Sequence, residues 1–377
     1  MKGKVLYIKN SSSKVNLNTY NVQAVGLGKA FCELGYDYDF VFFSNEEKIV
    51  QETDISGCKL RIISQKGIRV LRSYICPSIL NKEYLEKYDF VITTEYGQIM
   101  TYLLSKKSPN VILYSGPYYN LFKLPFVSPF YDLMFTKSIN SRCKVKFVKS
   151  ELAREYLEKK GYTELHNLGV GLDTTRFDTP VEIQQSTREL VDVMSNNRCL
   201  LYVGSLSDRK NFPFLLRVYE RIVEKNSDVK FVIIGKGNDK YVKKHLKNIS
   251  NQAQMGIVRI DSIDNVQLQF IYPLAKAFLL PSKLEIFGMV LLEAMYLGAP
   301  VITSWNGGSS VLINGKNTGQ IVKKFEVDQW AAATQKYLDD SEFAKEVTDN
   351  ARSLIEKEFV WDALAKKILE EVKSNVD

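Results

Sequence analysis

The chain has 377 residues, about the length of two domains of some 150–200 residues each. Hydrophobic residues make up 45% and charged residues 25%, a balance typical of globular proteins and not of disordered or fibrous ones. No apolar run approaches the roughly 20 residues that cross a bilayer, and Val5–Ile8 is too short for the apolar core of a secretory signal. We therefore expect a cytoplasmic protein.

Cysteine and histidine are too scattered to suggest a metal centre. The sequence has two histidines, His166 and His245, and no C-x-x-C pair. A structural zinc site or a disulfide framework needs clustered ligands. We expect neither a metal nor a bound cofactor, and we interpret the cysteines as reduced thiols: Cys32, Cys58, Cys76, Cys143 and Cys199.

The net positive charge of +8 is concentrated in the first half of the chain. Residues 1–180 contain 25 Lys and Arg against 18 Asp and Glu, whereas the remainder contains 26 against 25. Such a surface attracts an anionic membrane, a phosphorylated acceptor or nucleic acid, or it is a solvated face without a partner. We do not expect nucleic acid, because no known binding module accompanies the charge.

Short apolar runs alternate with helix-length stretches along the whole chain. The expected strands are Lys4–Lys9, Tyr38–Phe43, Tyr88–Thr94, Asn110–Tyr114, Val145–Val148, Cys199–Val203, Lys230–Ile234, Ile257–Ile260, Ala277–Leu280 and Pro300–Thr303. The helix-length stretches between them include Val22–Leu34, Glu151–Lys160, Phe214–Asn226 and Met289–Leu297, and further helices are expected at the C-terminus. Continuous Val, Ile, Leu and Phe runs fit strands that are buried on both faces of a parallel sheet, with helical crossovers between them.

This pattern occurs twice, on either side of the polar segment 181–198, which we interpret as a linker. We therefore predict an α/β protein of two doubly wound, Rossmann-like domains that face each other across a cleft. The expected domains are residues 1–185 and 199–360, and a C-terminal helix, 361–377, is expected to return to the first domain. Ligands of such sheets bind at the carboxyl ends of the strands.

Two of these strand ends carry glycine and basic residues. Gly204 and Ser205 follow one strand, and Arg209 and Lys210 lie just before the next helix, where two cations suit a diphosphate. Basic residues are also common in such loops without any ligand. Another strand ends in Gly235-Lys236-Gly237, which indicates either a ligand-binding turn or simply a tight turn.

The most informative stretch runs from Pro281 to Pro300. Gly288 predicts a close turn, and the N–H groups of Met289 and Val290, in a first helical turn without acids, are suited to an anion. Glu285 and Glu293 lie in otherwise apolar surroundings, and a buried carboxylate is costly without a partner. Sugar and ribose hydroxyls would be suitable donors. The alternative, two solvent-facing glutamates, does not explain the apolar neighbours.

The string EIFGMVLLEAMYLGAPVITSWNGG resembles the E-x7-E segment of the family 4 retaining glycosyltransferases, which have the GT-B fold. Further resemblances follow in the family's order and include its glycine and phosphate-loop elements: Gly35-Tyr36-Asp37, Gly171-Leu172-Asp173 with Phe177, Gly204 to Asn211, Gly235-x-Gly237 and Gly307-Gly308. The similarity is strong over residues 199–322 and faint before residue 165.

The resemblance implies a nucleotide-sugar donor in the second domain, an acceptor in the first, and no metal. It implies that Lys210, helped by Arg209, binds the diphosphate together with the glycine loops of Gly204, Ser205, Gly235 and Gly237. Backbone N–H groups from Phe287 through Gly288 and Met289 to Val290 would add to this hold. Glu293 would bind the ribose, Glu285 the transferred sugar, and Ile260 would flank the base.

Two of the departures from the family pattern bear directly on these assignments. Ser205 stands where relatives carry an arginine, and the first domain lacks the histidine that many relatives have, so Glu95 is the best acceptor-side acid. A surface role for Glu95 is an equal alternative. We expect a retaining, metal-independent enzyme of envelope polysaccharide or glycoprotein synthesis that uses a UDP-sugar.

Its expected acceptor is a glycan, a lipid-linked saccharide or a protein, reached in the cytoplasm or at an anionic inner membrane face. Two other functions stay open. One is a nucleotide-sugar epimerase of the same fold, and the other is a non-catalytic subunit or regulator.

Overall fold

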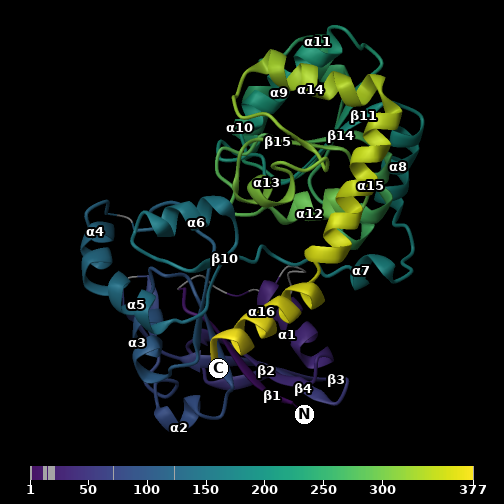
Figure 1. Ribbon diagram of the computed structural model, residues 1–377. Coiled ribbons are helices and arrows are strands. Elements are labelled where there is room, and N and C mark those ends of the chain that lie inside the picture. Colours follow the sequence, from purple (N-terminus) through teal and green to yellow (C-terminus); the bar gives the residue numbers. More distant parts are fainter. Residues whose placement is uncertain (1, 12–14, 16–21, 71, 123, 377) are drawn as a thin grey trace. The chain divides into compact units, whose positions relative to one another are not determined.

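The computed structural model describes residues 2–11, 15, 22–70, 72–122 and 124–376. The chain forms two compact units, Met1–Gly171 with Phe359–Asp377 and Leu172–Glu358. Both are α/β units built on largely parallel sheets, so the predicted fold class is confirmed in this respect (Figure 1). Residues 172–185, expected in the first domain, fall in the second unit.

The first unit contains an eight-stranded sheet in the order β10-β9-β8-β7-β1-β2-β4-β3 and a small two-stranded sheet of β5 and β6. Its strands are β1 (Gly3–Lys9), β2 (Tyr36–Ser44), β3 (Lys48–Ile55), β4 (Cys58–Lys66), β5 (Ile68–Val70), β6 (Ser73–Ile75), β7 (Phe90–Thr94), β8 (Val111–Ser115), β9 (Lys146–Val148) and β10 (Leu165–Asn167). Its helices are α1 (Gln23–Glu33), α2 (Lys82–Leu85), α3 (Ile99–Lys107), α4 (Val127–Tyr131), η1 (Asp132–Thr136), α5 (Lys137–Arg142), α6 (Glu151–Glu158) and α16 (Trp361–Val376).

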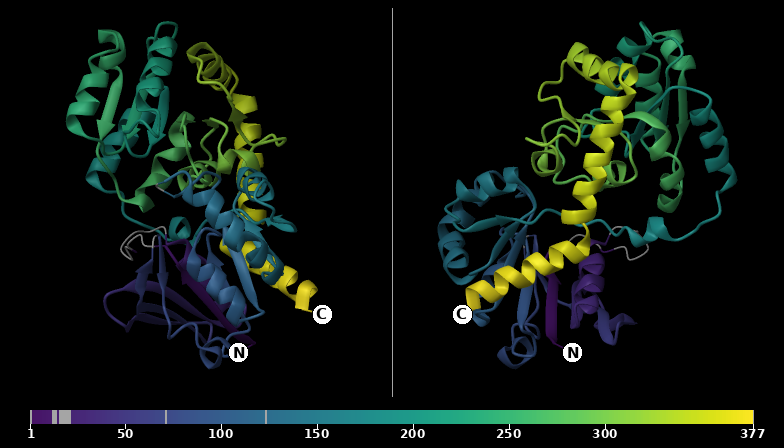
Figure 2. Two further views of the ribbon diagram at one scale, coloured as in Figure 1. Left: turned by 90° about the vertical axis from the view of Figure 1, so that its left-hand side faces the viewer. Right: turned by 45° about the vertical axis from the view of Figure 1, so that its right-hand side comes forward.

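The first unit's sheet is parallel except for the β3–β4 hairpin. Strand β3 was not predicted because it lies at the sheet edge and is mostly exposed, so its side chains form no apolar run. Its neighbour β4 was also not predicted, because polar residues interrupt its apolar ones. The short strands β5, β6, β10 and β16 were not predicted either. Helix α16 packs on α1, as Figure 2 shows. Gly26 of α1 allows this approach, since a Cβ there would lie 2.3 Å from the Trp361 ring nitrogen.

The second unit has a six-stranded, fully parallel sheet in the order β13-β12-β11-β14-β15-β16. Its strands are β11 (Cys199–Val203), β12 (Lys230–Ile234), β13 (Ile257–Ile260), β14 (Ala275–Leu280), β15 (Val301–Thr303) and β16 (Gln320–Ile321). Its helices are α7 (Thr175–Asp178), α8 (Gln185–Ser195), α9 (Phe212–Val223), α10 (Asp239–Leu246), α11 (Asn251–Met255), η2 (Asn265–Phe270), η3 (Tyr272–Leu274), α12 (Met289–Tyr296), α13 (Gly307–Leu312), α14 (Val327–Asp339) and α15 (Ser341–Glu358).

The expected linker 181–198 is largely helical, which corrects our interpretation of that segment. Helix α8 lies within it and buries Thr187, Leu190 and Met194 in the second unit. The spacing of these residues places them on one helix face. The segment was predicted as a linker because most of its residues are polar and only this narrow stripe is apolar.

Strands β11 and β14 are neighbours in the sheet, but the chain leaves them in opposite directions. From β11 it continues to β12 on one side, and from β14 to β15 on the other. The loops that follow the two strands therefore diverge from a common point. Parallel sheets bind ligands at such switch points, where the carboxyl ends of the strands meet.

Candidate active site

The loops after β11 and β14 are joined directly by hydrogen bonds. The backbone N–H of Lys283 donates to the carbonyl of Arg209 at 2.9 Å, and the Arg209 guanidinium donates to the carbonyl of Leu284, also at 2.9 Å. The structure thus brings the two sequence motifs together, although they are far apart in the chain. The same contacts fix the side chains that emerge from both loops.

Lys210 and Glu285 form an ion pair between the two loops. Their side chains are 10% and 14% exposed, and Arg209, which is 51% exposed, lies 3.6 Å from the same carboxylate. An ammonium has three donors, so Lys210 can hold Glu285 and still bind a second anion. Both predicted residues belong to one sheltered, charged cluster.

Asn211 helps to set the conformation of the loop that follows β11. It has a φ of 58°, in the left-handed region, and stands directly before α9. Asparagine tolerates this region better than most residues do. The resulting turn, in which Asn211 donates its N–H to the Asp208 carbonyl at 3.1 Å, places the preceding Lys210 against the β14 loop.

The glycines that follow β11 and β12 let two loops pass very close to each other. A Cβ on Gly235 would lie 1.8 Å from the carbonyl oxygen of Gly204, and one on Gly237 would lie 2.7 Å from the Leu206 Cβ. A hydrogen bond joins the same two loops: the N–H of Leu206 donates to the carbonyl of Lys236 at 2.8 Å. Loop packing is therefore a sufficient reason for both Gly235 and Gly237.

Ser205 is exposed, and its carbonyl accepts a hydrogen bond of 2.8 Å from the Tyr202 hydroxyl. Burial, and to a smaller extent the charge of Glu285, raises the pKa of Tyr202 well above its ordinary value. Tyr202 therefore remains a neutral donor that supports the loop. Arg209, and not Ser205, is the second cation of this loop beside Lys210.

A second glycine pair, at the beginning of α13, packs directly against the loop that follows β14. Cβ atoms on Gly307 and Gly308 would lie 1.8 Å and 1.9 Å from the carbonyl oxygens of Ile286 and Phe287. The N–H of Gly307 also donates to the carbonyl of Glu285 at 3.0 Å. The hydrogen bond and the close packing of the two glycines fix the position of the β14 loop just before α12 begins.

Helix α12 begins immediately after this loop. Gly288 precedes it with a φ of 85°, and the first turn, which begins with Met289 and Val290, contains no acidic residue. The positive end of the helix dipole is therefore not neutralised by a side chain of that turn. This matches the predicted anion-binding geometry, while the binding itself stays a prediction.

Glu293 lies inside α12 and is fully buried. Its Oε1 accepts a hydrogen bond of 3.2 Å from Asn265 in η2. The alternative of two solvent-facing glutamates is wrong, because both Glu285 and Glu293 are sheltered. Asn265 is a site candidate that we missed, because no motif links η2 to α12.

Ile260 stands at the end of β13 and is half-buried. Its carbonyl accepts a hydrogen bond of 2.9 Å from the N–H of Gly235. The residue expected to flank a base thus lies next to the glycine turn that follows β12.

Glu95 belongs to the first unit, whereas the residues above belong to the second. It follows β7 with a φ of 64°, a sparsely populated conformation for a residue with a side chain, and accepts a hydrogen bond of 2.8 Å from Gln98. Lys149, which follows β9, donates to Gln23 at 2.7 Å and lies 4.8 Å from the centre of the Tyr114 ring.

Desolvation lowers the pKa of Lys149 to about 8, and the nearby Glu95 partly opposes this shift. Burial also lowers the pKa of Lys9, again against the effect of Glu95. These two lysines, which we did not single out, make Glu95 part of a charged cluster. Their position directly at the strand ends was the signal that could have identified them.

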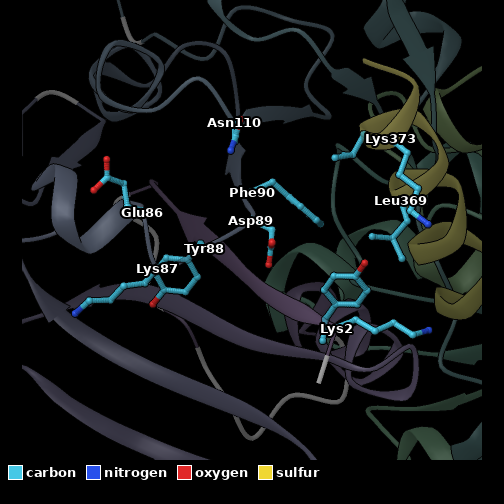
Figure 3. Close-up of a pocket in the computed structure, with 11 residues that line it drawn as sticks. Lys2, Glu86, Lys87, Tyr88, Asp89, Phe90, Asn110, Leu369 and Lys373 are labelled. Carbon is cyan, nitrogen blue, oxygen red and sulfur yellow. The ribbon is translucent and has the colours of Figure 1, made fainter. Parts of the chain in front are cut away.

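The first unit also has a pocket of about 600 Å³ at the opposite edge of its sheet. Figure 3 shows Leu369 and Lys373 of α16 on one side of it and Asp89 and Phe90, at the beginning of β7, on the other. None of the predicted site residues lines this pocket. It is therefore separate from the Glu95 cluster at the carboxyl end of β7.

Comparison with known proteins agrees with the geometry of the second unit. The family described as "Glycosyl transferases group 1" matches residues 185–354. The chain is 27% identical over 201 residues to "Uncharacterized glycosyltransferase MJ1607" of Methanocaldococcus jannaschii, which covers 52% of this chain and 50% of that protein. It is 26% identical over 255 residues to "Putative teichuronic acid biosynthesis glycosyltransferase TuaC" of Bacillus subtilis, covering 68% and 61%.

Among solved structures, Anabaena Alr3699/HepE in complex with UDP superimposes with a TM-score of 0.73 at 14% identity, covering 98% of this chain and 100% of that one. This likeness identifies the fold as GT-B. The matches to the first curated relatives span about half of the length of those proteins. Residues 185–354 of the second unit thus match the glycosyl transferases group 1 family, which confirms the expected resemblance.

Proposed function

We propose that this protein transfers a sugar from a nucleotide-sugar donor, with retention of the anomeric configuration and without a metal. The observation that carries the proposal is the sheltered Lys210–Glu285 pair beside the acid-free beginning of α12. It lies in the unit that matches the family, at the point where β11 and β14 diverge. We assign donor binding to the second unit and acceptor binding to the first.

Lys210 and Arg209 hold the donor diphosphate in this mechanism, and the N–H groups from Phe287 to Val290 add to that hold. Negative charge develops on the β-phosphate when its bond to the sugar breaks. Fixed cations and a helix dipole stabilise such charge without further rearrangement. The acceptor hydroxyl attacks on the same face of the sugar, and its proton passes to the leaving phosphate oxygen. Glu285 positions the sugar, and Glu293 the ribose.

We propose UDP as the nucleotide, supported by the UDP complex of the Anabaena protein. Our proposed acceptor is a glycan, a lipid-linked saccharide or a protein, with Glu95 as the acceptor-side acid. The printed name of the Bacillus subtilis relative, which refers to teichuronic acid, supports a role in envelope polymer synthesis. The basic excess of the first half favours action in the cytoplasm beside an anionic inner membrane face.

A thermal-shift screen with UDP-, GDP-, ADP- and dTDP-sugars tests the donor site. A donor at about 100 times its dissociation constant adds about 2.7 kcal/mol of stability. We expect the shift with a UDP-sugar and its loss in Lys210→Ala, while the exposed Lys244→Ala retains it.

Turnover distinguishes the remaining functions. Release of UDP that depends on an acceptor supports transfer, whereas isomerised sugar formed without an acceptor indicates an epimerase. Donor binding without any turnover over a panel of acceptors would indicate a regulatory subunit. No shift with any of the nucleotide sugars would contradict the proposed donor site.

A further inference from the structure

Residues 127–142 form one helical stretch at the edge of the first unit (Figure 1). Helix α4 passes through the π-helical segment η1 into α5, and the joining residues Asp132 and Lys137 both have right-handed helical backbone angles. The side chains of this stretch therefore follow helical spacing throughout. We call it the edge helix.

The inner face of the edge helix packs into the first unit. Tyr131 and Ile139 are buried on this face. The Tyr131 hydroxyl donates to the carbonyls of Tyr96 at 2.8 Å and Gln98 at 3.1 Å. The anchoring of the helix thus depends on its inner residues and not on the outer ones.

The outer face of the edge helix is also apolar. Its large outer side chains, together with Leu124 and Phe126 just before it, are exposed to a high degree: Leu124 53%, Phe126 69%, Phe130 64%, Leu133 83% and Met134 52%. A surface helix normally carries one apolar stripe and a polar opposite face. A contiguous exposed group of this size, with two phenylalanines, marks an interaction surface.

The turns that follow the apolar group are basic. Lys137, Arg142 and Lys144 are exposed there. Asp132 is the only acidic residue between positions 124 and 149, and it is ion-paired with Lys160. The surface is therefore apolar at one end and cationic at the other, with its one carboxylate already neutralised.

We infer that this surface docks onto an anionic lipid bilayer. Its members are Leu124, Phe126, Phe130, Leu133 and Met134, with Lys137, Arg142 and Lys144 beside them, and we call it the apolar–basic patch. A helix with Phe and Leu on one face and adjacent Lys or Arg lies in the bilayer interface, where apolar side chains enter the headgroup boundary and cations meet anionic lipid.

Charge decides between a membrane and a second copy of this chain. A second copy that met this surface through its own would offer no acidic partner to the basic end, because the one carboxylate of the surface, Asp132, is already paired with Lys160. An anionic bilayer satisfies both parts of the patch at once. No helix in the described part of the chain is long and apolar enough to cross a bilayer. The inference extends the membrane partner of the proposed function to named residues.

Vesicle flotation of the full chain tests the inference. We expect binding to vesicles of phosphatidylcholine with 30% phosphatidylglycerol, and at least tenfold weaker binding to phosphatidylcholine alone. Phe130→Ser with Leu133→Ser should reduce binding to anionic vesicles at least tenfold. The matched control is Met255→Ser, which removes a side chain that is 87% exposed on α11 of the second unit. Lys137→Glu with Arg142→Glu should abolish the preference for anionic lipid.

Three outcomes would overturn the inference. They are equal binding to both vesicle types, unchanged binding of the Phe130/Leu133 variant, and a wild-type dimer in light scattering that this variant loses. Circular dichroism verifies the fold of each variant, and the donor-induced thermal shift must persist in all of them. A variant that loses vesicle binding but keeps the donor-induced thermal shift tests the apolar–basic patch alone. If the wild type itself shows no donor-induced thermal shift, the proposed donor site is wrong, and the result says nothing about the patch.

Discussion

The ammonium group of Lys210 is ion-paired with the carboxylate of Glu285, although the two residues are 75 positions apart in the sequence. The sheet order causes this encounter, because β11 and β14 lie side by side and their following loops begin at the same edge. The pair joins the residue proposed to bind the diphosphate to the one proposed to bind the sugar. Replacing either partner therefore affects both halves of the donor.

Lys210→Ala should lower kcat/KM for the donor by about 10²–10³-fold, the usual effect of removing one preorganised group that stabilises developing charge. Steady-state kinetics with a UDP-sugar measure this loss. Lys244→Ala, an exposed lysine on α10, serves as the control and should retain activity. Equal rates for both variants would remove Lys210 from the proposed mechanism.

Glu293→Gln should leave the fold intact and weaken donor binding about tenfold. A glutamine carbonyl still accepts the hydrogen bond from Asn265, but the charged acceptor for ribose hydroxyls is lost. Isothermal titration with UDP measures the change. An unaltered affinity would assign Glu293 a purely structural role in α12.

Gly235→Ala should destabilise the second unit by about 1–3 kcal/mol, because the new methyl group meets the Gly204 backbone at 1.8 Å and one loop has to move. Urea denaturation measures the loss. The control is Gly97→Ala, where the nearest atom would lie 3.5 Å away, so that substitution should be nearly neutral. A neutral Gly235→Ala would show that the loops separate easily.

The stability effect of Lys149 should depend on pH. Its pKa is about 8 in the folded protein and 10.5 as its ordinary value, so the folded state prefers the neutral amine. Below pH 8 both states are protonated and the full cost of the buried charge is present. Between pH 8 and 10.5 the unfolded chain binds more protons than the folded one, so the free energy of unfolding rises with pH.

Lys149→Met removes this titration and keeps most of the side chain's volume. The variant should be more stable than the wild type at pH 7, and its advantage should shrink towards pH 10. Urea unfolding of both proteins across this range measures the difference. An advantage that does not change with pH would assign the effect to packing instead of to the charge.

Strands such as β11 and β12, which are almost completely buried, were predictable because their residues are apolar on both faces. The runs at β11 and β12 gave the observed bounds, and the motif after β14 identified the loop of Glu285. Strand β3 was not predictable, because its exposed edge position removes the apolar signal, and polar residues interrupt the apolar run of β4. The interactions of Glu285 with Lys210 and of Glu293 with Asn265 depend on which distant segments the sheet makes neighbours, and no local pattern contains that information.

The edge helix escaped prediction for a different reason. Its outer residues, such as Phe130 and Leu133, are as apolar as its inner ones, so no polar face produced a helical period. Pro129 also breaks the usual pattern of a helix interior. Which face of the edge helix is exposed follows only from the structure, in which the contacts of Tyr131 identify the inner face.

The first unit is completed by a segment that follows the second unit in the chain. The Trp361 ring at the beginning of helix α16 lies against Gly26 of α1 and against Gly171, where the first segment of this unit ends. During synthesis a ribosome must therefore produce the entire second unit before the first can close its own core. Until helix α16 has been made, the first unit lacks a segment that packs on α1, so it cannot reach its complete fold before the second unit has been synthesised.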